Sequence, residues 1–199
     1  MKTKRLFMAL AFICLCLFAN GQNGINNGHE YVDLGLSVKW ATCNVGANTP
    51  EEYGDYYAWG ETTTKSSYDS STSKTHKKEM SSIAGNPTYD VARKKWGSPW
   101  RLPTKAEFEE LRDNCTCEWT IQNGHNGYKV TSKKNGNSIF LPAAGWRYGT
   151  LSINQEARCH YWGASPCESQ TDLACYLDGD CAWGWCYRFY GCSVRPVSE

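Results

Sequence analysis

The alternation of apolar and polar residues near residue 30 predicts strands. Residues 31–34 and residues 36–42 alternate in polarity or run apolar on either side of Gly35. Short runs of this kind, broken by one glycine, are typical of two strand pieces joined by a bend. We therefore expect this part of the chain to form the first strands of the core.

Three Asn-Gly dipeptides predict tight turns in the middle of the chain. They are Asn123-Gly124, Asn126-Gly127 and Asn135-Gly136. Asparagine and glycine tolerate the positive φ angles that two-residue hairpin turns require. The last dipeptide separates two runs of strand-like residues, 128–132 and 138–141, so we expect a β-hairpin there.

Two stretches carry residues that begin and end helices. Asp90 is a favourable N-cap for a short helix, and Gly97 then ends it. Thr104 and Glu107 have the spacing of a capping box and predict a second helix that runs to about residue 113. One or two helices among many short antiparallel strands define an α+β domain.

A polar loop is expected between residues 62 and 82. Twelve of these 21 residues are Ser or Thr, and almost no apolar side chain stands among them. A segment of this composition has little to bury, so we interpret it as a solvated surface loop. An adhesive or glycosylated segment is the alternative interpretation.

The first residues of the chain resemble an export signal. A basic start is followed by an apolar run over residues 6–19 and by small residues at 19–21. This run is too short to span a bilayer, and no later run approaches about 20 apolar residues. We therefore expect a signal peptide at residues 1–21, a short linker at residues 22–30 and no transmembrane helix. The protein would be periplasmic, cell-surface or extracellular.

Composition and charge narrow the class of protein. The chain has 199 residues, of which 41% are hydrophobic and 21% charged, as in a globular domain. After the expected signal peptide, 18 basic and 20 acidic residues remain. This chain lacks the excess of positive charge that is typical of nucleic-acid-binding proteins. Nine cysteines also remain, and an exported protein can oxidise them to disulfides.

Seven longer motifs follow one another from residue 31 to residue 197. They are YVDLGL (31–36), WATCNVGA (40–47), GDYYAWGE (54–61), WRLPT (100–104), FLPAAGWR (140–147), YW (161–162) and GCSVRPV (191–197). In this order they resemble the Fibrobacter succinogenes major paralogous domain family. The resemblance implies a C-type-lectin-like fold of the formylglycine-generating-enzyme type, as found in exported proteins of Bacteroidetes-like bacteria.

The resemblance also implies how the domain is built. Residues 31–199 would form a single domain whose first and last strands pair, with residues 32–34 near residues 193–197. Five tryptophans are expected in the core, because indoles bury large areas. Three arginines are expected to tie loops to carboxylates or carbonyls through forked hydrogen bonds. These structural residues are Trp40, Trp59, Trp100, Trp146, Trp162, Arg101, Arg147 and Arg195.

Residues 159–190 differ from the rest of the chain. Six cysteines lie between residues 159 and 192, beside a group of aromatic residues. The segment is similar to the variable part of diversity-generating retroelement proteins, whose codons are randomised just before the final strand. This similarity implies an exported binding protein with an unknown protein or glycan ligand. The candidate contacts are His160, Ser165, Ser169, Asp172, Asp178, Asp180, Trp183, Trp185, Tyr187, Phe189 and Tyr190.

Two other functions compete with this interpretation. Cys181 and Cys186 have the spacing of the two cysteines that hold copper in formylglycine-generating enzymes, and thiolates suit copper(I). The chain would then be a copper-dependent oxidase; otherwise no cofactor or metal is expected. The second alternative is a purely structural cell-surface protein.

One disulfide is expected within the segments that resemble the family. Cys43 follows the first strands and Cys115 follows the second helix, and we predict that these two residues pair. Cys117 then either bonds elsewhere or is the odd thiol.

Overall fold

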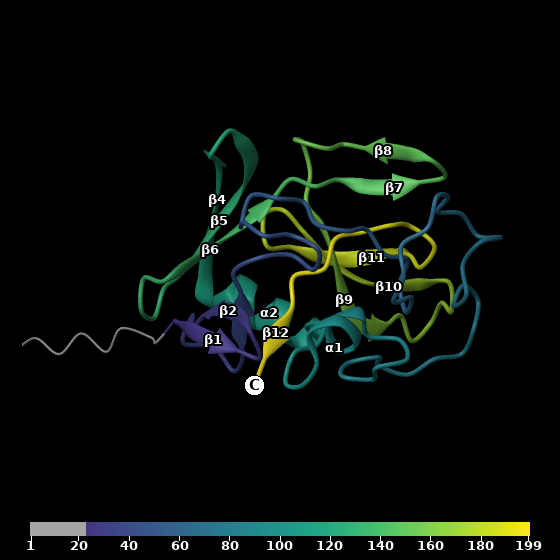
Figure 1. The fold of residues 1–199 in the computed structure, drawn as a ribbon, viewed down its shortest axis with the longest axis horizontal. Coiled ribbons are helices and arrows are strands. Elements are labelled where there is room, and N and C mark those ends of the chain that lie inside the picture. Colours follow the sequence, from purple (N-terminus) through teal and green to yellow (C-terminus); the bar gives the residue numbers. More distant parts are fainter. Residues whose placement is uncertain (1–22) are drawn as a thin grey trace, which may run out of the picture.

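The structure, a computed structural model, describes residues 23–199, so the expected signal peptide at residues 1–21 lies outside the described residues. It has two helices and many short antiparallel strands, which confirms the α+β class (Figure 1). The elements are β1 (Gly24–Asn26), β2 (His29–Val32), β3 (Lys39–Ala41), α1 (Val91–Trp96), α2 (Lys105–Asn114), β4 (Cys115–Gln122), β5 (His125–Ser132), β6 (Ser138–Pro142), β7 (Trp146–Tyr148), β8 (Leu151–Ile153), β9 (His160–Pro166), β10 (Leu173–Asp178), β11 (Trp183–Tyr187) and β12 (Val197–Ser198).

One four-stranded sheet joins the beginning of the described chain to its end. Its strand order is β1-β2-β3-β12, so the last strand pairs with β3, and β2 lies one strand away from it. The first strand does not pair directly with the last, so that expectation is wrong. The expected linker at residues 22–30 is also wrong for most of its length, because β1 and β2 form a hairpin there. Asn27 and Gly28 allow this turn by taking positive φ angles of 44° and 82°.

A second sheet is a meander of β4, β5 and β6. The expected hairpin between β5 and β6 is confirmed, with Val130 opposite Ile139. The expected turn at Asn126-Gly127 is wrong, since both residues lie inside β5. Gly127 is needed there for close packing: a Cβ atom on it would lie 2.5 Å from the carbonyl oxygen of Leu141.

Both helices begin where the capping residues predict. Asp90 accepts a hydrogen bond from the backbone N–H of Arg93 at 3.0 Å, and α1 ends before Gly97. Thr104 accepts from the backbone N–H of Glu107 at 3.3 Å, and the Glu107 carboxylate accepts from that of Thr104 at 2.7 Å. This reciprocal capping box starts α2, which continues to Asn114.

A third sheet, with strand order β11-β10-β9, separates the two main apolar clusters of the core. Alternate residues of β10 belong to different clusters: Cys175 and Leu177 to one, Ala174 and Tyr176 to the other. Both faces of this sheet are therefore largely covered. Side chains of this sheet therefore reach solvent mainly from the edge strand β11 and from the turns at the ends of the sheet.

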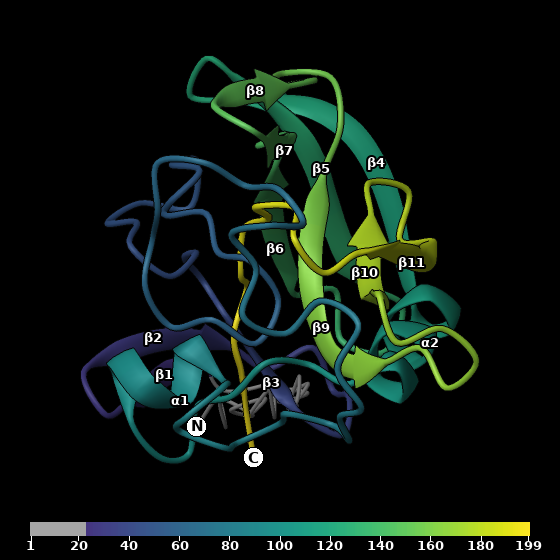
Figure 2. The same ribbon diagram turned by 90° about the vertical axis from the view of Figure 1, so that its right-hand side faces the viewer.

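The last residues of the chain pass through the interior. Residues 191–198, which we call the C-terminal strap, are all buried. Backbone hydrogen bonds connect the strap to five separate segments, at Val45, Tyr57, Arg101, Arg147 and Trp162. Two views of the ribbon show the strap between the other elements (Figures 1 and 2).

The Ser/Thr-rich segment 62–82 contains no helix or strand. Most of its side chains are exposed or half-buried, but Tyr68 and Thr75 are buried, at 4% and 1% exposure. The Tyr68 hydroxyl donates to the backbone carbonyl of Tyr56 at 2.5 Å, and the Thr75 hydroxyl donates to that of Trp59 at 2.6 Å. These two side chains fasten the loop to the core.

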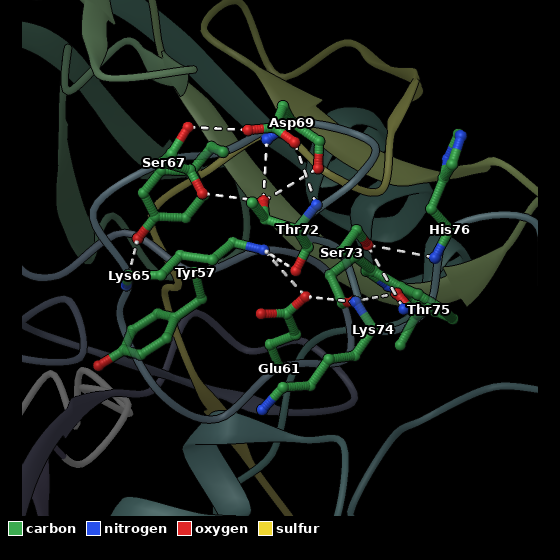
Figure 3. A network of polar contacts seen from close by, with 12 residues as sticks. Tyr57, Glu61, Lys65, Ser67, Asp69, Thr72, Ser73, Lys74, Thr75 and His76 are labelled. Carbon is green, nitrogen blue, oxygen red and sulfur yellow. Dashed lines mark hydrogen bonds and ion pairs between the residues drawn. The ribbon is translucent and has the colours of Figure 1, made fainter.

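Two carboxylates shape the path of this loop (Figure 3). Asp69 accepts hydrogen bonds from the backbone N–H groups of the second and third residues after it, both at 3.0 Å. The buried carboxylate of Glu61 accepts from the backbone N–H of Lys74 at 2.8 Å and from Lys65 Nζ at 3.1 Å. The loop is thus held by its own polar groups.

The disulfide of the structure joins Cys117 to Cys181, so the predicted Cys43–Cys115 pair is wrong. Cys115 is 4% exposed and packs in the apolar cluster that includes Leu111. Cys43 is half-buried beside the first sheet, in different surroundings. Position along the motifs could not reveal that the turn after β10 lies against β4.

We expect the substitution Cys117→Ser to lower the free energy of unfolding by about 4 kcal/mol, because the bond closes a loop with a sequence separation of 64. Urea denaturation without reductant measures this loss. The matched control is Cys43→Ser, which removes a free thiol and should change stability by less than about 1 kcal/mol. A non-reduced peptide map that links Cys43 to Cys115 would contradict the assignment.

Candidate ligand-binding surface

The edge strand β11 presents aromatic side chains on one side. Trp183, Trp185 and Tyr187 alternate with Gly184 and Cys186 along it. Trp185 is 38% exposed and Tyr187 is 43% exposed, whereas Cys186 is buried in the core. The strand therefore holds its aromatic residues at the border between core and solvent.

Four rings from two parts of the chain form one surface, which we call the aromatic face: Tyr148, Tyr187, Phe189 and Tyr190. Ring centroids are 5.2 Å apart for Tyr187 and Phe189, and 4.9 Å apart for Phe189 and Tyr190. Tyr148, from β7, lies 5.4 Å from Tyr190 and is 50% exposed. The aromatic face thus joins the β7–β8 hairpin to the turn after β11. Figure 1 shows the backbone of these two segments.

A second layer of rings supports the aromatic face from the core side. Trp146 lies 6.4 Å from Tyr190 and 4.4 Å from His160, whose ring stacks on Tyr176 at 4.6 Å. Trp146 and Tyr176 are half-buried against the core, and His160 is only 7% exposed. We therefore reassign His160 from ligand contact to support.

The rings of His160, Tyr176 and Tyr190 are uncharged at neutral pH. Burial lowers the pKa of His160 to about 4, although the negative charge of Asp178 acts in the opposite direction. Burial raises the pKa of Tyr176 to about 12 and also raises that of Tyr190. A neutral aromatic surface with phenol hydroxyls suits contacts with apolar side chains or with the apolar faces of sugar rings.

Arg188 fixes the turn that carries the aromatic face. Its side chain runs inward and is 1% exposed. The guanidinium donates to the backbone carbonyls of Leu173 at 3.0 Å, Thr75 at 3.3 Å and Lys78 at 2.8 Å. It also lies 4.4 Å from the ring centroid of Trp59. The Ser/Thr-rich loop and β10 are therefore tied to the turn from the inside.

Trp183 and Trp185 form a separate pair. Their ring centroids are 5.6 Å apart, and Lys105 Nζ lies 4.4 Å from the ring centroid of Trp183. Trp183 packs against the core cluster that α2 also enters. Among residues 23–199, no ring contact joins this pair to the aromatic face. The single set of aromatic anchors expected from the sequence is therefore divided into two.

The polar candidates lie around the ends of the β9–β11 sheet. Ser165 Oγ accepts a hydrogen bond from the first backbone N–H of α2 at 3.1 Å, which is a structural contact. Asp178 forms an ion pair with the guanidinium of Arg158 at 3.5 Å. Asp180 accepts a hydrogen bond from the backbone N–H of Ala182 at 3.1 Å. Ser169 and Asp180 are exposed, whereas Asp172 and Asp178 are half-buried.

The tryptophans that the sequence assigns to the core have two kinds of position. Trp40, Trp59, Trp100 and Trp162 are at most 1% exposed. The indole N–H groups of Trp59 and Trp162 donate to backbone carbonyls at 2.8 and 2.7 Å. Trp146 is half-buried in the layer beneath the aromatic face. It therefore contributes to the site as well as to the core.

The three arginines assigned structural roles differ from one another. The guanidinium of Arg101 donates two hydrogen bonds to the carboxylate of Glu107, at 2.9 and 2.6 Å. The buried Arg195 donates hydrogen bonds to the side-chain oxygen of Asn44 at 2.8 Å and to the backbone carbonyl of Ala41 at 3.2 Å. Arg147 instead lies 4.9 Å from the ring centroid of Tyr56, and its guanidinium has no carboxylate or carbonyl partner among the described residues. The expected role is wrong for the Arg147 side chain.

The residues of the copper alternative do not fit a copper(I) site. Such a site needs two thiolates, and Cys181 is bonded to Cys117. Cys186 is buried and hydrogen-bonded to Cys192, within the core cluster beneath β11. Within residues 23–199, no group of three or more His, Cys, Asp or Glu side chains is arranged to hold a metal ion.

Comparisons with family models, curated proteins and solved structures give no match for this chain. No helix among residues 23–199 is long and apolar enough to cross a membrane. The function is therefore inferred from the site itself.

Sequence reasoning missed the contribution of the β7–β8 hairpin to the site. Tyr148 is 50% exposed and Leu151 is 62% exposed, but nothing in their local sequence distinguishes them from other surface residues. The hairpin reaches the turn after β11 because Arg147 and Gly191 exchange two backbone hydrogen bonds, at 2.7 and 3.0 Å. Only the fold creates this proximity.

We expect His160 to make stability depend on pH. Its pKa is about 4 in the folded protein and about 6.5 in an unfolded chain. Between these values the unfolded chain binds a proton that the folded protein does not. The free energy of unfolding should therefore fall by roughly 3 kcal/mol as pH falls from above 6.5 to about 4.

The variant His160→Phe keeps a ring between Trp146 and Tyr176 but cannot titrate. Urea denaturation from pH 7.5 to 4 should show a smaller loss of stability for this variant than for the unchanged protein. His125→Phe is the matched control, because the His125 side chain is 45% exposed and lies outside the layer. Equal pH dependence in the unchanged protein and His160→Phe would rule out this role.

Proposed function

We propose that the chain is an exported ligand-binding protein in which a C-type-lectin-like scaffold displays a diversified surface. The ligand, a protein or a glycan, would contact the aromatic face and the exposed part of residues 159–190. The observation that carries the proposal is the aromatic face itself: four contiguous aromatic rings on a supporting layer of packed rings. Rings held in place lose little entropy on binding, which makes them good anchors.

The distribution of burial along residues 159–190 supports a diversified surface. Exposed side chains such as Asp180, Trp185 and Tyr187 alternate with buried residues that hold the backbone, such as Ala174 and Arg188. Substitution of an exposed side chain removes few core contacts. The segment can therefore change its chemistry while its backbone stays in place.

The arrangement of the sheets also supports display. The sheet of β1, β2, β3 and β12 lies at one end of the molecule, and the β7–β8 hairpin lies at the other (Figure 1). The end of the chain and the aromatic face are thus far apart. A scaffold of this shape leaves the binding surface clear of any attachment at the chain end.

We expect exposed residues of the segment to tolerate polar substitution. Trp185→Ser and Tyr187→Ser should each lower the free energy of unfolding by less than about 1 kcal/mol, because both side chains are more than one-third exposed. Arg188→Ser should cost roughly 3 kcal/mol or more, because three buried or partly buried carbonyls lose a charged donor. Urea denaturation of the three variants measures these changes in the free energy of unfolding. Equal losses at all three positions would argue for a purely structural surface.

Sequencing of a growing population tests diversification directly. Substitutions should concentrate in the codons of exposed residues such as Asp180, Trp185 and Tyr187, and should be absent from codons 188 and 191–197. Codons 31–147 provide the internal control for background mutation. A segment as invariant as that control would overturn diversification and favour a fixed ligand or a structural protein.

A further inference from the structure

A pocket of about 370 Å³ lies on the opposite side of β7 from the aromatic face. Three segments line it, around residues 55, 66 and 149. Strand alternation places the Arg147 side chain toward the pocket and that of Tyr148 toward the aromatic face. Backbone hydrogen bonds of 2.9 and 2.8 Å between Tyr68 and Gly149 join two of the segments. The volume is typical of a site for one small molecule.

Arg147 brings a positive charge to this pocket that no carboxylate neutralises. Its guanidinium lies over the ring of Tyr56, at 4.9 Å from the centroid. It forms no side-chain hydrogen bond or ion pair with any of the residues 23–199. A half-buried guanidinium has five N–H donors in a planar fork, which matches the two oxygens of a carboxylate.

The other charged groups of the pocket are already paired. Lys65 Nζ lies 3.1 Å from the buried carboxylate of Glu61, as Figure 3 shows. Asp55 lies 3.7 Å from Lys95 Nζ and accepts a hydrogen bond from the Tyr57 hydroxyl at 2.8 Å. The pocket therefore has one unpaired positive charge, that of Arg147.

Three hydroxyl side chains line the same pocket. The side chains of Thr64, Ser66 and Thr150 line the pocket and make no hydrogen bond to other described residues. The rings of Tyr56 and Tyr68 are fixed, because their hydroxyls donate to backbone carbonyls at 2.6 and 2.5 Å. The pocket thus combines one unpaired cation, three hydroxyls without a partner among the described residues and two fixed rings.

We infer that this pocket binds a sugar acid, a small polyhydroxylated molecule with one carboxylate. Arg147 would receive the carboxylate, and Thr64, Ser66 and Thr150 would bond the sugar hydroxyls. A single unpaired cation matches a single negative charge better than a doubly charged phosphate. The inference does not rest on the proposed function, because none of these residues belongs to the aromatic face.

Isothermal titration of the purified protein with D-glucuronate, D-glucose and inorganic phosphate tests the inference. Glucuronate should bind at least about tenfold more tightly than either of the other two, because only it offers both the charge and the hydroxyls. Arg147→Gln should weaken glucuronate binding about tenfold or more. Arg147→Lys keeps the charge but loses the fork, and should give an intermediate loss.

Two further variants separate binding from folding. Thr150→Val removes an exposed pocket hydroxyl and should weaken glucuronate binding severalfold with an unchanged unfolding temperature. Arg158→Gln changes an arginine that is 59% exposed and outside the pocket, and should leave binding unchanged. The inference fails if glucuronate does not bind, if glucose or phosphate binds equally well, or if Thr150→Val and folded Arg147→Gln both bind normally. Such a failure would leave the aromatic face and its sequencing test unaffected.

Discussion

The burial of the C-terminal strap is the constraint on which the rest of the structure depends. A strand in the interior must satisfy every backbone N–H and C=O group without water. The strap meets much of this need through partners far apart in sequence, including Tyr57, Val45 and Trp162. Its arginine, Arg195, is fully buried and donates to Asn44 at 2.8 Å. The segments around Val45 and Tyr57 and the β9–β11 sheet are therefore held together by the eight residues of the strap.

This constraint explains how the surface near residues 180–190 can be exposed and still have a fixed shape. The strap begins directly after the turn that carries the aromatic face, and Arg188 anchors the same turn to the Ser/Thr-rich loop. On the other side, the Cys117–Cys181 bond ties the β10–β11 turn to β4. Fixed points therefore flank the exposed side chains of β11. Their identity affects what the surface contacts more than how the chain folds.

Local sequence predicted the elements that depend on local chemistry. The capping box of Thr104 and Glu107 and the turn at Asn135-Gly136 involve residues within a few positions of one another, and both are as expected. The partner of Cys117 and the role of Tyr148 depend on segments brought together by the strap and the sheets. Gly127 shows the same limit, because only the neighbouring strand explains why a glycine stands inside β5. Long-range packing of this kind has no local pattern in the sequence.

The cysteines of residues 159–192 belong to the buried part of this segment, which holds its backbone in place, and not to its exposed surface. Cys159, Cys175, Cys181, Cys186 and Cys192 are all buried, so they are poor candidates for diversified contacts. Burial raises the pKa of Cys175 to about 12 and holds those of Cys159 and Cys192 above the usual range. Since the thiolate is the reactive form, these thiols resist oxidation without being paired. The chemistry of the surface of residues 159–190 is therefore left to aromatic, hydroxyl and carboxylate side chains.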